Sequence, residues 1–128
     1  MRRPNADVSA DPEGAVSSPV RVALVTAPDE ETAEALGRAV VEEGLAACAN
    51  VLPGVTSVYR WRGEVRRDAE ALIILKTTDA RAGDLTRRVA EMHPYDMPEV
   101  LILETKGGYT PYLDWVREET GSGSGGRS

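Results

Sequence analysis

The chain has 128 residues with one cysteine and one histidine, and 21 acidic against 15 basic side chains give it a net charge of −6. The acidic balance excludes a general nucleic-acid binder, which needs a basic face, and a single cysteine excludes an internal disulfide. No stretch approaches the roughly 18 apolar residues of a membrane span, so we expect one soluble, cytoplasmic domain that binds neither nucleic acid nor membrane.

Both ends of the chain differ in composition from its middle. Residues 1–18 are rich in Pro, Ala, Asp and Ser without periodicity, which predicts a disordered arm. Residues 120–128 have the Gly/Ser composition of a flexible tail. The folded domain is therefore expected over residues 19–119.

The first predicted elements are a strand and a helix. The β-branched apolar run at 20–26 predicts the strand. Asp29 is placed to cap the helix that follows, and Gly44 to end it. The expected apolar face of this helix consists of Ala33, Leu36, Val40 and Val41.

A long hairpin comes next. Residues 45–61 are extended, and Pro53-Gly54 predicts a bulge within them. Arg62-Gly63 predicts the turn, after which residues 64–78 return as a strand.

The last elements complete a βαββαβ order. Asp79 is predicted to cap a second helix, whose end Pro94 sets because a residue before proline avoids the helical conformation. Residues 99–104 form a fourth strand, and Thr110-Pro111 starts a short terminal helix. The order predicts an α+β, ferredoxin-like sandwich: a four-stranded antiparallel sheet with both main helices on one face and a long bent hairpin. The apolar face of the second helix is expected at Ala82, Leu85, Val89 and Met92.

Catalysis has little support in the sequence. Only His93 could serve as the base of a hydrolytic triad, and the chain has neither a nucleophile elbow nor a Walker loop. We therefore expect that the protein is not an enzyme.

The single histidine and the single cysteine are candidate metal ligands. His93 stands in the proline-bounded segment MHPYDMP, and both imidazole and thiolate suit copper. The alternatives are a half-buried His93 that donates to a backbone carbonyl and a Cys48 that packs as a small hydrophobe. One chain supplies too few such ligands for a stable site, but a symmetric oligomer could multiply them.

Five further residues are candidates for a cleft or a partner surface. Lys76 ends an apolar strand and could either face a ligand or extend its amine to solvent. Glu99 could pair with Lys76, and Tyr95 is suited to lining a cleft. Tyr59 and Trp61 share one face of the hairpin near its tip, which favours a partner surface, or else packing under the terminal helix.

Four strings, in this order and spacing, resemble the CutA divalent-cation-tolerance family: TAPDEETAEAL, LAACANVLPGVTSVYRWRGEV, ILKTT and HPYDMPE. The resemblance covers about residues 20–119. It implies a ferredoxin-like subunit in a tight homotrimer, in which the hairpin, with Tyr59 and Trp61, reaches across to neighbouring subunits. The architecture is similar to that of PII-type signalling proteins, with clefts between subunits.

The resemblance also implies a role in copper tolerance, with Cu(II) or another divalent ion as ligand. His93 with Cys48 is then the expected metal-binding set, although Val25 and Met92 stand where further Cys or His ligands would help. The alternatives are a PII-like module that binds a small anionic ligand at Lys76, and a structural trimer whose hairpin docks another protein. The recurrent family positions map onto Cys48, Trp61, Lys76, His93, Tyr95 and Glu99.

Overall fold

The computed structural model describes residues 10–12 and 18–121. The order of its main elements confirms the predicted βαββαβ arrangement with a terminal helix. These elements are β2 (Val20–Ala27), α1 (Glu30–Glu42), β3 (Cys48–Trp61), β4 (Glu64–Thr78), α2 (Asp79–Met92), β5 (Val100–Glu104) and α3 (Thr110–Glu119).

One small ribbon was not predicted. Strand β1 (Ala10–Pro12), which falls within the predicted N-terminal arm, pairs antiparallel with β6 (Gly107–Tyr109). Residues 1–9 and 13–17 of that arm, and 122–128 of the predicted tail, lie outside the described residues.

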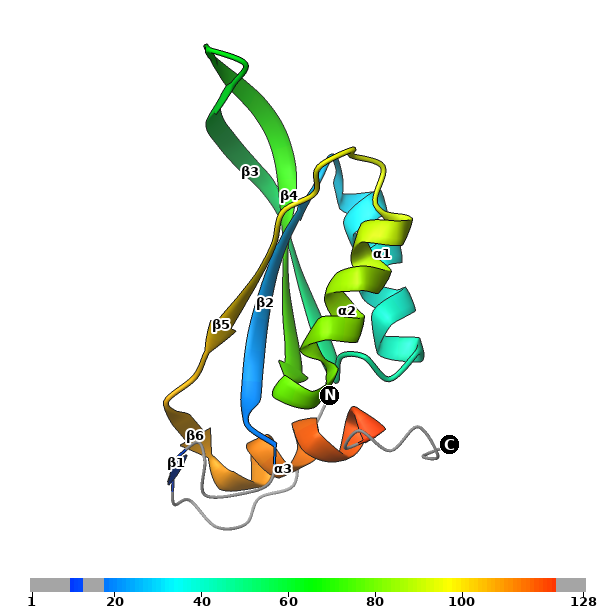
Figure 1. Cartoon of the computed structure of the whole chain (residues 1–128), viewed down its shortest axis with the longest axis vertical. Helices are drawn as coiled ribbons and strands as arrows, with labels where there is room; N and C mark the ends of the chain where they lie inside the picture. Colours follow the sequence, from blue (N-terminus) through cyan, green and yellow to red (C-terminus); the bar gives the residue numbers. More distant parts are fainter. Residues whose placement is uncertain (1–9, 13–17, 122–128) are drawn as a thin grey trace.

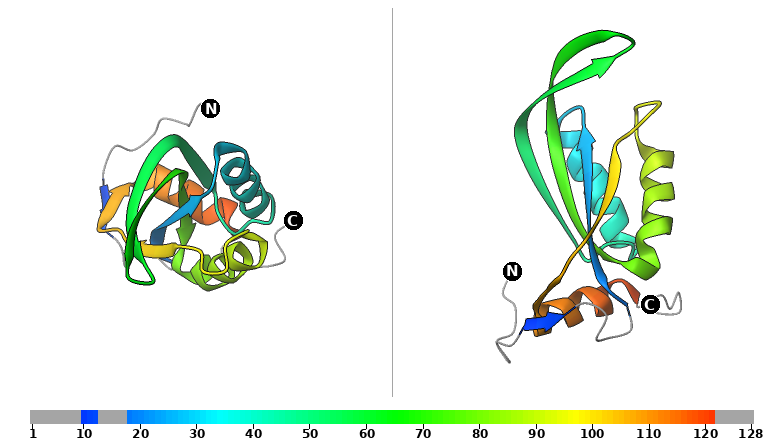
Figure 2. Two further views of the ribbon diagram at one scale, coloured as in Figure 1. Left: turned by 90° about the horizontal axis from the view of Figure 1, so that it is seen from above. Right: turned by 60° about the vertical axis from the view of Figure 1, so that its left-hand side comes forward.

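The main sheet has the strand order β3-β4-β2-β5, and every neighbouring pair is antiparallel. Helices α1 and α2 cover one face of this sheet, whereas α3 crosses the end opposite the hairpin (Figures 1 and 2). The fold is thus the expected α+β, ferredoxin-like sandwich, and the helices leave the second face of the sheet uncovered.

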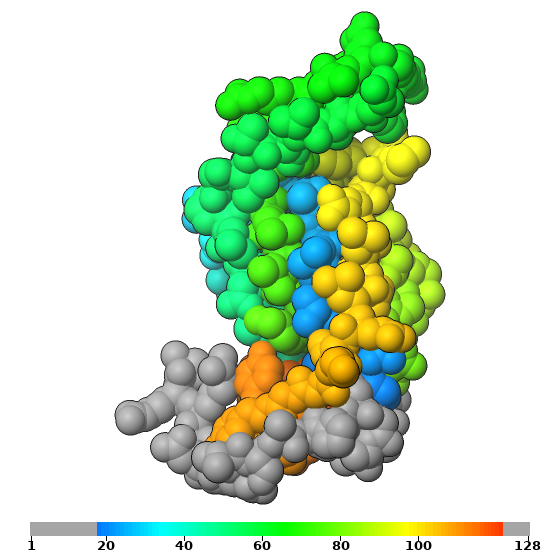
Figure 3. Space-filling view, turned by 90° about the vertical axis from the view of Figure 1, so that its left-hand side faces the viewer, coloured from blue at the N-terminus to red at the C-terminus, as the bar shows by residue number. Residues whose placement is uncertain are grey.

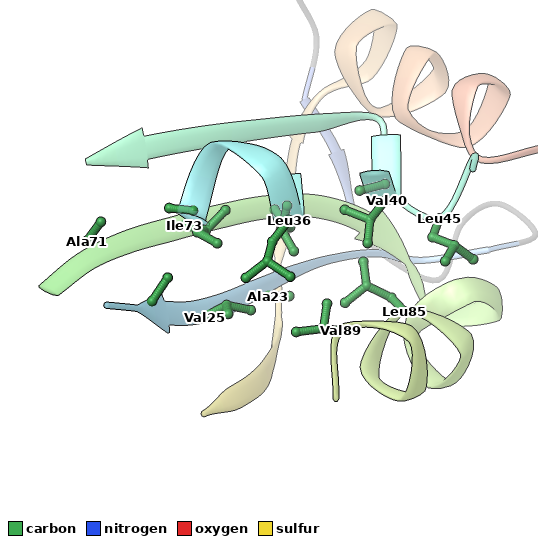
Figure 4. Packing of buried hydrophobic residues seen from close by; sticks show 13 residues of the cluster. Ala23, Val25, Leu36, Val40, Leu45, Ala71, Ile73, Leu85 and Val89 are labelled. Carbon is green, nitrogen blue, oxygen red and sulfur yellow. The ribbon is translucent and has the colours of Figure 1, made fainter. Parts of the chain in front are cut away.

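The core fills the space between the sheet and the two helices (Figure 4). Successive side chains of a strand point to opposite faces, so every second residue of β2 and β4 enters this core. The contributions of the two strands are Ala23, Val25 and Ala27, and Ala71, Ile73 and Leu75. The two helices complete the core on their side with Leu36 and Val40 of α1 and with Leu85 and Val89 of α2.

Helix α1 begins and ends as its sequence predicts. The side chain of Asp29 accepts a 2.7 Å hydrogen bond from the Thr32 amide, and Gly44 follows the helix with a φ of 74°. The prediction for Val41 was wrong, because its side chain is 37% exposed. It lies about 100° around the helix from the buried Val40, on the solvent side.

The start of helix α2 differs from the prediction. Its N-cap is Thr78, and Asp79 is the first helical residue. The Asp79 amide donates to the carbonyl of Pro19, and its carboxylate lies 3.5 Å from the guanidinium of Arg21. The helix ends before Pro94 as expected, and its C-cap His93 has an extended backbone.

The hairpin of β3 and β4 extends well beyond the helices (Figure 1). The pairing register shifts between Leu52 and Val55, which confirms the bulge predicted at Pro53-Gly54. Arg62 and Gly63 form the two-residue turn, and both have a positive φ, 51° and 85°. This pair of dihedrals is typical of a type I′ turn, whose twist matches that of the strands.

The uncovered face of the sheet, which Figure 3 shows, carries exposed apolar side chains. Residues that pair directly across neighbouring strands lie on the same face, so the pairs Leu24–Leu101 and Val22–Leu103 identify this surface. Leu101 is 52% exposed and Leu103 is 42% exposed. We call this surface the open sheet face; it also includes Leu52, Leu72 and Ile74.

Candidate functional site

A cleft of about 610 Å³ lies between the part of the hairpin beyond the Pro53-Gly54 bulge and the segment that links α2 to β5. We call residues 93–99 the elbow and this cavity the hairpin cleft. In the space-filling view the hairpin overhangs the elbow at the top of the open sheet face (Figure 3). The aromatic residues that line the hairpin cleft are Tyr59 and Trp61 of β3 and Tyr95 of the elbow.

The charge of the hairpin cleft is strongly acidic. Among the residues that the structure describes, four carboxylates line it, together with the guanidinium of Arg66. Two of these acids stand on β4 and two on the elbow: Asp68, Glu70, Asp96 and Glu99. The cleft therefore attracts cations and repels anions.

Hydrogen bonds tie the two aromatic hydroxyls to acids of β4. Tyr95 Oη donates to Glu70 Oε2 at 2.7 Å, and Tyr59 Oη donates to Asp68 Oδ2. Burial, reinforced by the hydrogen bond to Glu70, raises the pKa of Tyr95 well above its usual value. The hydrogen bond to Asp68 raises the pKa of Tyr59. Both hydroxyls thus stay protonated and hold the carboxylates in place.

His93 is buried, with 7% of its surface exposed, and it is not among the residues that line the cleft. Its Nε2 lies 2.7 Å from the carbonyl oxygen of Thr26, and its Nδ1 accepts a 3.1 Å hydrogen bond from the Tyr95 amide. The ring is therefore the neutral Nε2–H tautomer, and both nitrogens are engaged by backbone. This geometry matches the alternative of a structural histidine, and it orients Tyr95 toward the cleft.

Three of the four predicted cleft residues line the hairpin cleft, namely Trp61, Tyr95 and Glu99. Glu99 accepts a 3.4 Å hydrogen bond from Thr26 Oγ1. Trp61 and Tyr59 do not pack under α3, which lies at the opposite end of the molecule (Figure 1).

Lys76 and Cys48 lie elsewhere. They pair across β4 and β3 on the open sheet face, where Asn50 Oδ1 accepts from Lys76 Nζ and lies 3.7 Å from Cys48 Sγ. Glu99 is hydrogen-bonded to Thr26, and Thr26 pairs with Leu72 of β4. Lys76 stands four residues further along β4, at a distance of about 13 Å from Leu72. A pair between Lys76 and Glu99 within one chain was therefore expected wrongly.

The acids of β4 were not predicted as cleft residues from the sequence. Asp68 and Glu70 alternate with Arg67 and Ala69, so they share a strand face, and Ser57 pairs with Asp68 on that face. This period of two could have placed them beside Tyr59, but charged residues on an exposed hairpin are common.

No single chain assembles a complete metal site from the residues that the structure describes. Among these residues, no group of three or more His, Cys, Asp or Glu side chains is placed to hold an ion. His93 and Cys48 are on different elements and at different ends of β2, so one chain does not bring them together. Within 10–12 and 18–121, no helix is long and apolar enough to cross a membrane.

A family model described as CutA1 divalent ion tolerance protein matches residues 21–119. The chain belongs to this CutA1 family. The divalent-cation tolerance protein CutA of Thermus thermophilus is 50% identical over 100 residues, which are 78% of this chain and 97% of that protein. The human protein CutA is 44% identical over 109 residues, 85% of this chain and 61% of its own length.

Solved CutA1 structures have the same fold. The Thermus thermophilus structure matches with a TM-score of 0.78 at 49% identity, over 80% of this chain and 99% of that one. The structure of CutA1 from Oryza sativa matches with a TM-score of 0.77 at 44% identity, over 79% of this chain and 93% of that one. The family resemblance inferred from the four sequence strings is thereby confirmed.

Proposed function

We propose that the chain acts in divalent-cation tolerance as a homotrimer that binds divalent ions next to its subunit interfaces. The hairpin cleft carries this proposal, because four carboxylates face one cavity beside an uncovered apolar surface. Carboxylate oxygens are the ligands that divalent ions such as Mg²⁺, Ca²⁺ and Mn²⁺ prefer. The names of relatives in this family refer to tolerance of divalent cations, which supports the same role.

The homotrimer is supported by the open sheet face. Soluble monomers rarely expose a large contiguous apolar patch, yet Leu101, Leu103 and Leu52 are 40% to 52% exposed on this face. Three copies whose open faces meet around a threefold axis would bury it. Light scattering at micromolar concentration should give three times the subunit mass, whereas a monomer would contradict the proposal. Trp61→Ala should weaken assembly, since an interface aromatic often contributes more than about 2 kcal/mol.

A neighbouring chain would complete the ligand set. The described part of one chain supplies no ready group of three ligands, and a stable site usually needs three or four. The cleft opens beside the proposed interface, so carboxylates such as Glu99 and Glu70 can combine with groups of the adjacent subunit.

Copper coordination by His93, with or without Cys48, stays a prediction. To bind Cu(II), the imidazole must give up its contact with either Thr26 or Tyr95. We therefore rank the carboxylates of the cleft ahead of His93 as ligands. Cys48 is half-buried on the open sheet face and would reach an ion only near the threefold axis.

Calorimetric titration with Cu(II), Zn²⁺ and Mg²⁺ tests the assignment. We expect Glu99→Gln to weaken binding of all three ions, and Cys48→Ser to leave it unchanged. His93→Ala should keep a residual site whose affinity falls only because Tyr95 loses its support. Loss of Cu(II) binding in His93→Ala with the trimer intact would make the imidazole the ligand. If Glu99→Gln binds every ion as the parent does, the hairpin cleft is not the cation site.

A PII-like function is the second candidate, and the observation that favours it is the polar cluster of Lys76, Asn50 and Cys48 on the open sheet face. An anionic ligand would bind at Lys76 and not in the acidic hairpin cleft. A thermal-shift screen with nucleotides, repeated on Lys76→Ala, distinguishes it from the first candidate. For either function we propose binding without catalysis, and a cytoplasmic location stays a prediction.

A further inference from the structure

The acids of the hairpin cleft are spaced out. Asp68 and Glu70 are two residues apart on one strand face, which separates them by about 7 Å. The other two acids, Asp96 and Glu99, come from the elbow. A bare metal ion needs several oxygens within about 2.0–2.6 Å of one point, and the described residues form no such group. Within one chain, carboxylates spaced in this way also match a ligand that carries several separated positive charges.

The aromatic rings of the cleft add a second kind of recognition. An ammonium or guanidinium group is attracted to a ring face within about 6 Å of its centroid. Trp61 already interacts in this way with its own chain, because Arg62 Cζ lies 5.5 Å from the centre of its ring. Tyr59, Tyr95 and the 71% exposed Met97 provide further apolar surface, which a metal ion cannot use but an alkyl chain can.

The carboxylates that hold the tyrosines are still able to bind a ligand. Each carboxylate has two oxygens with about four acceptor positions. Glu70 receives one hydrogen bond from Tyr95, and Asp68 receives one from Tyr59. The remaining acceptor positions of both acids can therefore receive N–H donors.

We propose that the hairpin cleft binds an organic polycation, an aliphatic chain with two or more ammonium or guanidinium groups. Its charged groups pair with the spaced carboxylates of β4 and the elbow, and its alkyl segments pack on the rings of Tyr59, Trp61 and Tyr95. This inference does not depend on divalent-ion binding, because it rests on the rings and on the spacing of the acids.

Calorimetric titration of the full-length protein with spermidine, at about 0.15 M salt to screen exposed charges, tests the proposal. We expect saturable binding to the parent protein. Trp61→Leu should weaken it about threefold or more, because a cation–ring contact is lost. In samples that light scattering shows to be still trimeric, the same substitution should leave Mg²⁺ binding unchanged, since Mg²⁺ takes oxygen ligands only. Glu99→Gln should weaken the binding of both spermidine and Mg²⁺.

Two further variants complete the design. Glu34→Gln removes an exposed acid of α1 outside the cleft, and it should change neither titration. Tyr59→Leu removes another ring and replaces Trp61→Leu as the test if that variant changes its assembly state. Absence of saturable spermidine binding to the parent overturns the proposal, as does equal binding by the ring variants. Spermidine binding without Mg²⁺ binding would contradict only the divalent-ion proposal.

Discussion

The hydroxyl of Tyr95 donates a 2.7 Å hydrogen bond to Glu70 Oε2, and this bond joins the elbow to the root of the hairpin. His93 fixes the position of Tyr95. Its Nδ1 accepts a hydrogen bond from the Tyr95 amide, and its Nε2 donates one to the carbonyl of Thr26 near the end of β2. The position of the hairpin relative to the sheet thus depends on side chains that are far apart in the sequence.

Tyr95→Phe should lower the free energy of unfolding by about 1 kcal/mol, because it removes a half-buried hydrogen bond to a carboxylate. Urea denaturation at one fixed protein concentration measures this loss. Tyr59→Phe is the matched control: it removes the same hydroxyl from an exposed residue, and we expect a change within about 0.5 kcal/mol. Equal losses of unfolding free energy in the two variants would show that the Tyr95–Glu70 bond contributes no more to stability than the Tyr59–Asp68 bond.

Stability should fall in alkaline solution above about pH 10. The folded state raises the pKa of Tyr95 above its usual value of 10.0. The unfolded chain therefore loses this proton first as the pH rises, and the unfolded state gains stability relative to the folded one. Thermal melts between about pH 9 and 11 should show the loss.

Tyr95→Phe should flatten this alkaline decline, and Tyr59→Phe should flatten it further when combined, since the pKa of Tyr59 is raised as well. A decline of unchanged steepness in the double variant would assign the effect to other groups.

Leu101→Lys should dissociate the proposed trimer, because it places a charge on the open sheet face. Light scattering should report a lower mass together with an unchanged circular dichroism spectrum. Val41→Lys is the control, since Val41 is exposed on the outer side of α1, away from that face. Dissociation by both variants, or by neither, would argue against assembly through the open sheet face.

Two glycine-to-alanine changes in helices should act in opposite directions. At Gly37 an added Cβ would lie 2.9 Å from Ala49 Cβ, so Gly37→Ala should destabilise the protein by about 1 kcal/mol or more through overpacking. At Gly83 of α2 an added Cβ meets nothing within 4 Å, and alanine is the better helix former. Gly83→Ala should therefore stabilise by about 0.5–1 kcal/mol. Urea denaturation of both variants tests the pair, and a stabilising Gly37→Ala would show that α1 can move away from β3.

Local chemistry explains why much of the fold could be predicted. Asp29 caps α1 through an amide three residues away, and the Pro53-Gly54 bulge and Arg62-Gly63 turn need only the backbone preferences of their own residues. The prediction failed where a distant partner competes. Asp79 is not the cap of α2 but its first residue, and its amide donates to the carbonyl of Pro19, a partner far away in the sequence.

The sequence by itself determined the order of the elements, the family and the aromatic side of the hairpin cleft, because period, turn chemistry and motif are properties of short segments. Only the tertiary structure decided which candidates meet. It occupies both nitrogens of His93 with backbone groups, one of them 67 residues away, and it separates Lys76 and Cys48 from the cleft. It also brings Glu70 to Tyr95 across 25 residues. Such contacts depend on how β2, β4 and the elbow pack together. The local sequence pattern of a short segment does not contain this information.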